Sequence, residues 1–236
     1  MNVRVIKSLK PSDPYMNLAV EEALNNVEVD KPVIRFWVNK PSVVLGRFED
    51  VIGEVNVDYC LINDIAIVRR HSGGGTVYHD EGNLNITLVL PRVYGGRLTL
   101  CYDILKDLLV STLNSLKLKD IITTSNEVLV NGKKVSGMAG SLTKYSLLCH
   151  STLLVSSDLI KLRSSLRRLK REVTKLSDEV GHDITIEGIY TYIIRLLSKV
   201  FLWRVVIDNL TTDEVKLAEE LYLSKYSRDS WNFKTQ

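Results

Sequence analysis

The sequence predicts an α+β fold in which helices flank a mixed, largely antiparallel sheet. Runs typical of strands, with alternating or β-branched apolar residues, are interspersed with long amphipathic helical stretches. Two connections between strands, at 39–41 and 131–132, contain the turn-forming residues of a hairpin or a corner, which favours antiparallel neighbours. No repeat, low-complexity tract or clear linker interrupts the 236 residues, so we expect a single domain covering 1–236.

Local signals define the elements of the first half. Residues 2–6 alternate as in an edge strand, and Ser12-Asp13-Pro14 supplies a helix N-cap with proline at the first helical position. In the helix that follows, the apolar residues from Leu18 to Val27 share one face, whereas Glu21 falls on another. Further expected elements are strands at 32–38 and 42–46, a helix at 49–63, and strands at 65–68 and 83–90.

The second half alternates in the same way. Residues 98–116 form a strongly amphipathic helix. Asn131-Gly132 is a type I′ hairpin signal, so Lys133 and Lys134 open the returning strand and point to opposite faces. A helix at about 185–200, a strand at 203–207, and a helix that begins at a Thr211/Glu214 capping box complete the expected fold.

Composition narrows the class of protein. The formal charge of +3 is too small to argue for nucleic acid, and neither a signal peptide nor an apolar run long enough to span a membrane is found. Cys60, Cys101 and Cys149 are widely spaced, without a CxxC pair, so reduced thiols in a cytoplasmic protein are the simplest interpretation. Cys149 is expected to be a small core residue rather than a nucleophile.

The stretch Arg69–Asn85, reading RRHSGGGTVYHDEGNLN, carries the densest functional signal. Its three consecutive glycines leave the backbone amides open to an anion, and the arginines before them suit phosphate or carboxylate oxygens. His79, Asp80, Asn83 and Asn85 add polar groups to a strand-like segment. The alternative is a glycine-rich turn with solvated arginines. A Walker loop is excluded because no Gly-Lys-Ser/Thr follows the glycines.

The seventeen residues closely resemble the signature RRxSGGGxVxHDxGN of the lipoate-protein ligase family, which is related to biotin ligases and octanoyltransferases. Arg47 after Gly46 matches the family's G-R, and the pattern K-x-S-G-x-A selects Lys134 over Lys133. His150 matches the family's H-G-T-L-L, although Ser151 replaces the glycine. From its surroundings alone, His150 is either satisfied in the core or lining a cavity.

The resemblance implies the biotin/lipoate ligase catalytic-domain fold and a two-step reaction. Lipoate's carboxylate would attack the α-phosphate of ATP, with Mg²⁺, to give lipoyl-AMP, and an acceptor lysine would then take the acyl group in a dry slot near Val44, Val77 and Leu153. The implied catalytic residue is Lys134. The implied nucleotide- and lipoate-binding residues are Arg47, Arg70, Ser72, Gly73, Gly74, Gly75, Thr76, Val77, Tyr78, His79, Asp80, Asn83, Lys134, Ser136, Gly137, Ala139 and His150. His79 and Asp80 stay open between ribose, metal and structural roles.

The resemblance also implies partners. Acceptors would be acidic lipoyl domains of the 2-oxoacid dehydrogenase E2 or glycine cleavage H protein type, and the basic run at 158–176 is a candidate docking face. Many family members continue into a C-terminal accessory domain that is not expected here, so either the protein works without it or a second polypeptide supplies it. We expect weak or absent adenylation by this chain alone. The alternatives are an octanoyl or lipoyl transferase acting from an acyl carrier, which would need a cysteine near 119–121, and a lipoyl-AMP-binding subunit without turnover.

Overall fold

The computed structural model, which describes residues 2–234, is built on an eight-stranded sheet with strand order β11-β1-β2-β6-β10-β9-β8-β7. Its strands are β1 (Asn2–Ser12), β2 (Val33–Asn39), β6 (Asn83–Pro91), β7 (Ile121–Thr123), β8 (Glu127–Val130), β9 (Lys133–Leu142), β10 (Ser146–Leu154) and β11 (Arg204–Asp208). The pairs β11/β1 and β1/β2 are parallel, whereas all pairs from β2 to β7 are antiparallel. The prediction of a mixed, largely antiparallel sheet is therefore confirmed.

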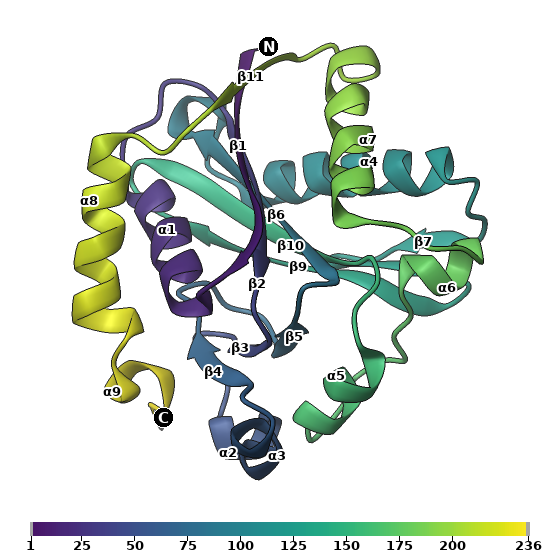
Figure 1. Cartoon of the computed structure of the whole chain (residues 1–236). Coiled ribbons are helices and arrows are strands. Elements are labelled where there is room, and N and C mark those ends of the chain that lie inside the picture. The colour runs from purple at the N-terminus through teal and green to yellow at the C-terminus, as the bar shows by residue number, and fades with distance from the viewer. Residues whose placement is uncertain (1, 235–236) are drawn as a thin grey trace.

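Helices cover both faces of this sheet (Figure 1). On one face, α4 (Leu98–Ser115) and α7 (Ile186–Lys199) pack into the main core with apolar residues of β1, β2, β6, β9 and β10. On the other face, α1 (Pro14–Asn26) and α8 (Thr212–Leu221) bury Val20, Ala23, Leu24 and Ala218 against the sheet. The sheet is thus buried on both sides, as its long apolar strands require.

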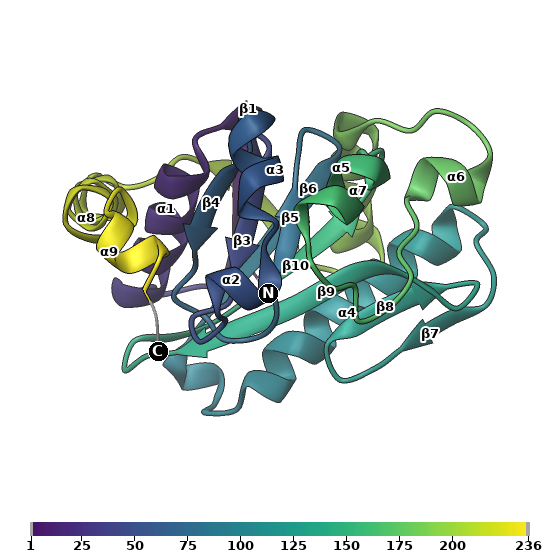
Figure 2. The same ribbon diagram turned by 90° about the horizontal axis from the view of Figure 1, so that it is seen from below.

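A small second sheet lies next to α1. Its strands, in the order β4-β3-β5, are β3 (Ser42–Leu45), β4 (Ala66–Arg69) and β5 (Val77–His79). Figure 2 looks onto this sheet and onto α2 (Val51–Glu54) and α3 (Val57–Ile62), which pack against it together with α5 (Leu159–Ser165). Residues 39–41 are consequently a corner by which the chain changes sheets, which settles the alternative left open by the sequence.

The last elements return to the small sheet. After α6 (Leu176–Val180), α7, β11 and α8, a π-helical turn at Tyr222–Tyr226 leads into α9 (Asp229–Asn232). A 3₁₀ turn at Arg92–Tyr94 follows β6. The Asp13 cap with Pro14, the Asn131-Gly132 turn with positive φ at both residues, and the Thr211/Glu214 capping box form as predicted.

Several elements differ from the prediction. The first strand extends to Ser12 and is interior rather than an edge, because β11 pairs beyond it. The helix expected at 49–63 is two short helices, because Val55 leaves the helix to bridge Leu166 and Asn56 caps a new one. Strand β7, paired with β8, was not anticipated.

The interpretation of three reduced cysteines is wrong. Cys101 of α4 and Cys149 of β10 form a disulfide across 48 residues of sequence, and Cys60 is a buried free thiol. Both half-cystines are fully buried in the main core, so Cys149 is a cross-link and not only a small packing residue. Because two of the three cysteines form a disulfide, the cysteines no longer support a reducing compartment. None of the helices within residues 2–234 combines the length and apolar character needed to cross a bilayer.

Candidate active site

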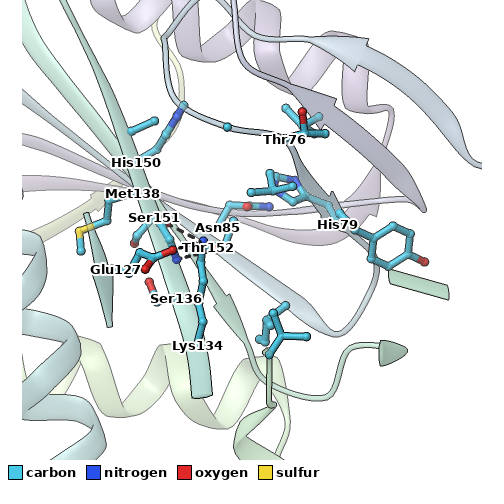
Figure 3. A pocket seen from close by; sticks show the side chains of 18 of the residues that line it. Thr76, His79, Asn85, Glu127, Lys134, Ser136, Met138, His150, Ser151 and Thr152 are labelled. Carbon is cyan, nitrogen blue, oxygen red and sulfur yellow. Dashed lines mark hydrogen bonds and ion pairs between the residues drawn. The ribbon is translucent and has the colours of Figure 1, made fainter. Parts of the chain in front are cut away.

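A cavity of about 210 Å³ lies between the small sheet and strands β9 and β10 (Figure 3). Its walls come from α1, β2, the loop at residues 73–76 (called the glycine loop below), β5, β9, β10 and the segment 166–173. One end is deeply buried beside Trp37, which is 1% exposed, and the other end opens beside Lys134, whose side chain is 24% exposed. The cavity is thus a slot with an inner apolar end and an outer charged end.

The glycine loop forms the upper wall of the slot. Gly74 has φ of 84°, and its carbonyl packs so closely on Gly46 that a Cβ there would lie 1.8 Å from it. The two glycines therefore let the loop sit directly on the end of β3. Within residues 2–234, the backbone amides of residues 73–76 have no hydrogen-bond acceptor, so they are available to oxygens of a ligand.

Arg70 holds the carbonyl side of this loop. Its guanidinium donates to the carbonyl oxygens of Gly73 at 2.6 Å, Gly75 at 2.7 Å and Val44 at 3.2 Å, and Nε donates to the Ser72 hydroxyl at 3.0 Å. Burial lowers the pKa of Arg70 to about 10, so the side chain keeps its charge at neutral pH. Arg70 therefore shapes the loop and contributes positive potential to the cavity wall.

Arg69 points the other way and is 1% exposed. Its guanidinium donates to the carbonyl oxygens of Glu49 at 2.7 Å, Gly46 at 3.1 Å and Trp231 at 3.1 Å. The indole of Trp231 donates back to the Arg69 carbonyl at 2.8 Å. Arg69 thus ties the C-terminal segment to the loop at 46–49, on which the glycine loop rests.

Lys134 reaches the cavity because β9 is irregular at this point. Ser136 pairs with Val128 but Lys134 pairs with Leu129, so Val135 is an extra residue in the strand. The backbone N–H of Lys134 donates to the Glu172 carbonyl at 2.8 Å, and its carbonyl accepts from the Thr174 N–H at 3.0 Å, at the end of the 166–173 wall. The side chain then lies over Gly137, where a Cβ would be 2.9 Å from Nζ. A Cβ at 137 would therefore push the flexible end of Lys134 aside.

Glu127 compensates two cations at the outer end. Its carboxylate lies 2.9 Å from Lys134 Nζ and 3.1 Å from Arg171 Nε. Burial raises the pKa of Glu127, but the hydrogen bonds and charges of Lys134 and Arg171 outweigh burial and lower it. Arg168 and Lys170, within the described chain, have no such partner, and Lys170 Nζ lies 3.6 Å from the position of a Cβ on Gly75. Excess positive charge therefore faces the glycine loop across the opening.

A buried polar network connects the inner end of the slot to the loop. Glu21 is fully buried and accepts from Thr87 and from His150 Nδ1 at 2.8 Å, while His150 Nε2 lies 3.1 Å from the Ser72 hydroxyl. Burial alone raises the pKa of Glu21, but the charge and hydrogen bond of His150 lower it to about 2. His150 is therefore held by partners on two sides, and it lines the cavity as well.

The side chains singled out from the sequence divide into two groups. Those that line the cavity are Arg70, Gly75, Thr76, Val77, Tyr78, His79, Lys134, Ser136, Gly137, Ala139 and His150. Those outside its lining are Arg47, Ser72, Gly73, Gly74, Asp80 and Asn83. Ser72 still contacts the cavity-lining Arg70 and His150.

Several residues in the second group have evident local partners. Arg47 is exposed, and its guanidinium lies over the Phe48 ring. The two carboxylate oxygens of Asp80 accept from the amides of Gly82 at 2.9 Å and Asp158 at 2.7 Å, which closes the turn before β6. Leu153, expected in the acyl slot, faces the main core, and its neighbour Leu154 lines the cavity instead.

Glu21 and Glu127 are the principal residues that the sequence reasoning missed. Glu21 was placed off the buried face, yet Leu18, Glu21 and Asn25 follow a spacing of three and four and share one buried stripe. A carboxylate inside such a stripe is a signal for a buried site. Glu127 carried no comparable signal, because its role depends on the bulge that brings Lys134 opposite it.

Comparison with known proteins places this geometry in a family. The model of the lipoyl protein ligase A/B catalytic domain matches residues 13–198. The chain belongs to this family. A curated relative, lipoate-protein ligase A subunit 1 of Thermoplasma acidophilum, is 30% identical over 98% of this chain and 97% of its own length.

Solved structures of family members share the fold. A lipoate protein ligase from T. acidophilum with bound lipoic acid superposes with a TM-score of 0.89 at 31% identity, covering 99% of this chain and 100% of the other. A lipoate-protein ligase A bound with ATP gives 0.89 at 31%, covering 99% of each chain. A bi-partite lipoate protein ligase studied with its E2 lipoyl domain, also from T. acidophilum, gives 0.88 at 30%, covering 99% and 96%. The lipoate-ligase catalytic fold predicted from the sequence is confirmed.

Proposed function

We propose that this chain, as a single catalytic domain, activates lipoate with ATP to lipoyl-AMP and passes the lipoyl group to a lysine of an acceptor protein. The observation that carries the proposal is the convergence, in one cavity, of the Lys134 ammonium group and the glycine loop with its unpaired amides. The lipoate-bound and ATP-bound relatives support the same two substrates.

The outer end of the cavity suits the first step, in which two anions must meet. A carboxylate and an α-phosphate repel each other by several kcal/mol in a partly buried site unless cations are already in place. Lys134, Arg70 and Lys170 supply the charge, and the amides of residues 74–76 supply fixed donors. Because the Glu127 carboxylate forms an ion pair with Lys134 in this structure, an incoming substrate anion would compete with Glu127 for the ammonium group.

The inner end suits the acyl tail. Leu18, Trp37, Val44 and Val77 form apolar walls. Between them, Glu21, His150 and Ser72 are bonded to one another, whereas His79 Nε2 has no partner within the described chain. Such a slot excludes water from the reactive mixed anhydride. Within residues 2–234 no cluster of three or more His, Cys, Asp or Glu side chains could hold a metal ion, and the Glu127 carboxylate is paired with Lys134 and Arg171. Mg²⁺ brought in with ATP would therefore be held mainly by the substrate phosphates, whose charge it would neutralise.

The cysteines make the acyl-carrier alternative less favourable. A transferase of that kind needs a cysteine nucleophile in the cavity. In this chain Cys101 and Cys149 are cross-linked, and Cys60 belongs to the core beneath the small sheet. The lipoyl-AMP-binding alternative is separated from ligation by supplying lipoyl-AMP: a ligase modifies the acceptor lysine in a single turnover, and a binding subunit does not.

Two partners complete the proposal. The relative named subunit 1 and the bi-partite ligase support a second polypeptide, and the E2 lipoyl domain studied with that ligase supports a lipoyl-domain acceptor. Arg163 and Arg167 are exposed on the basic segment and lie outside the cavity lining. Reversing both to Glu should raise the acceptor KM at low salt without changing the KM for ATP, and an unchanged acceptor KM would refute docking at this face.

The central test compares two adjacent lysines. Lys134→Ala should lower the rate of lipoate-dependent pyrophosphate exchange by about 100-fold or more, whereas Lys133→Ala, whose exposed amine pairs with Glu172, should stay within about twofold. Exchange is measured with the chain alone and with a candidate second subunit. An undiminished rate in Lys134→Ala would refute the assignment, and robust exchange by the chain alone would remove the need for the partner.

A further inference from the structure

His79 is held as a hydrogen-bond donor by a chain of buried side chains. Arg35 can only donate, and its Nη2 donates to Asn17 Oδ1, which fixes Asn17 Nδ2 as a donor. Asn17 Nδ2 donates to Asn39 Oδ1 at 2.8 Å, so Asn39 Nδ2 is the group that donates to His79 Nδ1 at 3.0 Å. Nδ1 must therefore be the unprotonated nitrogen of the ring.

The proton of the neutral ring consequently lies on Nε2. Burial, together with the charges of Arg70 and His150, lowers the pKa of His79 to about 3, which keeps the ring neutral at physiological pH. His79 is 4% exposed, and Nε2 has no partner within the described chain. A buried N–H without an acceptor costs free energy, so its retention in a cavity wall points to a ligand atom that accepts from it.

The position of His79 in the cavity indicates which part of a ligand could accept the hydrogen bond from Nε2. The ring lies 6.0 Å from the Trp37 ring at the inner end of the slot, whereas Lys134 enters from β9 at the open end (Figure 3). If Lys134 binds the substrate carboxylate, as proposed above, the far end of the acyl tail reaches His79. Asn85 Nδ2 is a second unpartnered N–H donor in the cavity lining. Unpartnered hydroxyls are also present, on Thr76, Tyr78, Ser136 and Ser151, but a hydroxyl can rotate toward other acceptors. The imidazole cannot, because Asn39 fixes its tautomer.

We propose that His79 Nε2–H is a specificity determinant that donates a weak hydrogen bond to a ring sulfur of the dithiolane and so favours lipoate over octanoate. A sulfur atom is a weak hydrogen-bond acceptor. The methyl end of octanoate offers no acceptor, so the same N–H would be buried without a partner in that complex. Arg35, Asn17 and Asn39 act as positioning residues, because they set the tautomer without touching the tail. This inference rests on the proposed lipoate site.

The test measures equilibrium binding of lipoate and octanoate to the intact chain by calorimetry. His79→Leu should lower the lipoate-to-octanoate affinity ratio about five- to tenfold, by weakening lipoate and relieving the penalty on octanoate. His79→Gln, which keeps an N–H donor, should retain most of the preference. Val77→Ala, an apolar change in the same wall, should weaken both acids alike.

A second variant changes the tautomer of His79 without replacing the histidine. Asn39→Asp replaces the donor with a carboxylate that can only accept, which moves the proton to Nδ1 and leaves Nε2 as an acceptor. It should reproduce the loss of preference without altering the cavity wall. ¹⁵N spectra of the ring nitrogens should report the Nε2–H tautomer in the wild type and its loss in Asn39→Asp.

The outcomes separate this inference from the proposed function. If the wild type binds neither acid, the lipoate site itself fails. If it binds both and His79→Leu leaves the ratio unchanged, or alters only ATP binding, the assignment of His79 to the tail is overturned. A wild-type ring protonated on Nδ1 would overturn it without any variant.

Discussion

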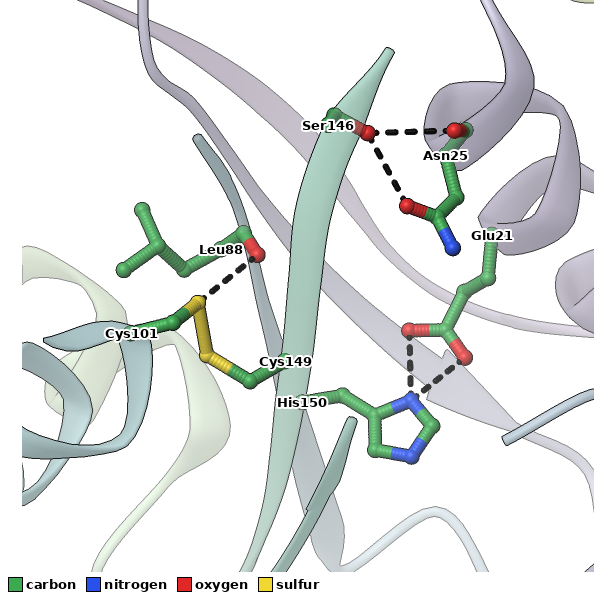
Figure 4. Close-up of a disulfide and its surroundings, with 7 residues drawn as sticks. All are labelled: Glu21, Asn25, Leu88, Cys101, Ser146, Cys149 and His150. Carbon is green, nitrogen blue, oxygen red and sulfur yellow. Dashed lines mark hydrogen bonds and ion pairs between the residues drawn. A yellow bond between two sulfur atoms is a disulfide. The ribbon is translucent and has the colours of Figure 1, made fainter. Parts of the chain in front are cut away.

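Removing the disulfide between Cys101 and Cys149 should cost this protein about 4 kcal/mol of stability. The cross-link joins α4 to β10 across 48 residues of sequence. Closing a loop of that length removes about 14 cal/mol/K of entropy from the unfolded chain, which corresponds to about 4 kcal/mol at 25 °C. Cys149 and His150 project from opposite sides of β10 (Figure 4), so the cross-link also fixes the strand that carries the cavity histidine.

The assay is urea unfolding of the double variant Cys101→Ala/Cys149→Ala, with Cys60→Ala as the matched control. The control deletes a buried sulfur from a different cluster and closes no loop. The double variant should therefore lose about 4 kcal/mol beyond twice the loss in the control. For a chain of 236 residues, that difference lowers Tm by about 10 °C.

Two results would refute this reasoning. Alkylation of the unfolded wild type without reductant should label one thiol, Cys60, and with reductant three; labelling of three thiols in both conditions would exclude the cross-link. An excess loss below about 1 kcal/mol would show that loop closure contributes little, for example because the unfolded chain is already compact in this region.

Two further predictions concern acid and the C-terminal segment. Burial lowers the pKa of His71 to about 4, so the folded protein keeps this ring neutral, whereas the unfolded chain protonates it near pH 6.5. The contribution of the neutral ring to the free energy of unfolding is therefore complete above pH 6.5. It is lost at up to about 1.4 kcal/mol per pH unit as the pH falls toward 4. Glu21, with a pKa of about 2, adds a second loss as pH falls from about 4.5 toward 2. Urea midpoints measured from pH 7 to pH 3 check both, and His71→Gln should flatten the upper part of the curve. Trp231→Phe removes the indole N–H that donates to the Arg69 carbonyl behind the glycine loop. This substitution should lower the free energy of unfolding by about 1–3 kcal/mol and raise the KM for ATP. An unchanged urea midpoint would contradict this prediction.

Local sequence signals predicted most of the elements and one half of the site. The cap at Asp13, the turn at Asn131 and the triple glycine each depend on a few adjacent residues, so they could be read without knowledge of the fold. The Glu127–Lys134 pair could not, because it requires a one-residue bulge in β9. Nor could the disulfide, whose cysteines come together only when α4 packs on β10.

The two arginines of the motif show what residue type alone leaves out about a role. A guanidinium beside a glycine loop predicts anion binding, yet Arg70 donates to the carbonyls of Gly73 and Gly75 in the loop and to that of Val44 in β3. Arg69 is committed to the backbone at 46–49 and to Trp231. Both roles have the same physical consequence. A peptide loop that turns its amides toward a ligand must turn its carbonyls elsewhere, and buried carbonyls without donors are costly. By supplying donors to the carbonyls of Gly73 and Gly75, Arg70 leaves the loop stable while the N–H groups of residues 73–76 have no acceptor within the described chain. The anion site proposed above would therefore combine backbone amides with the arginine charge behind them.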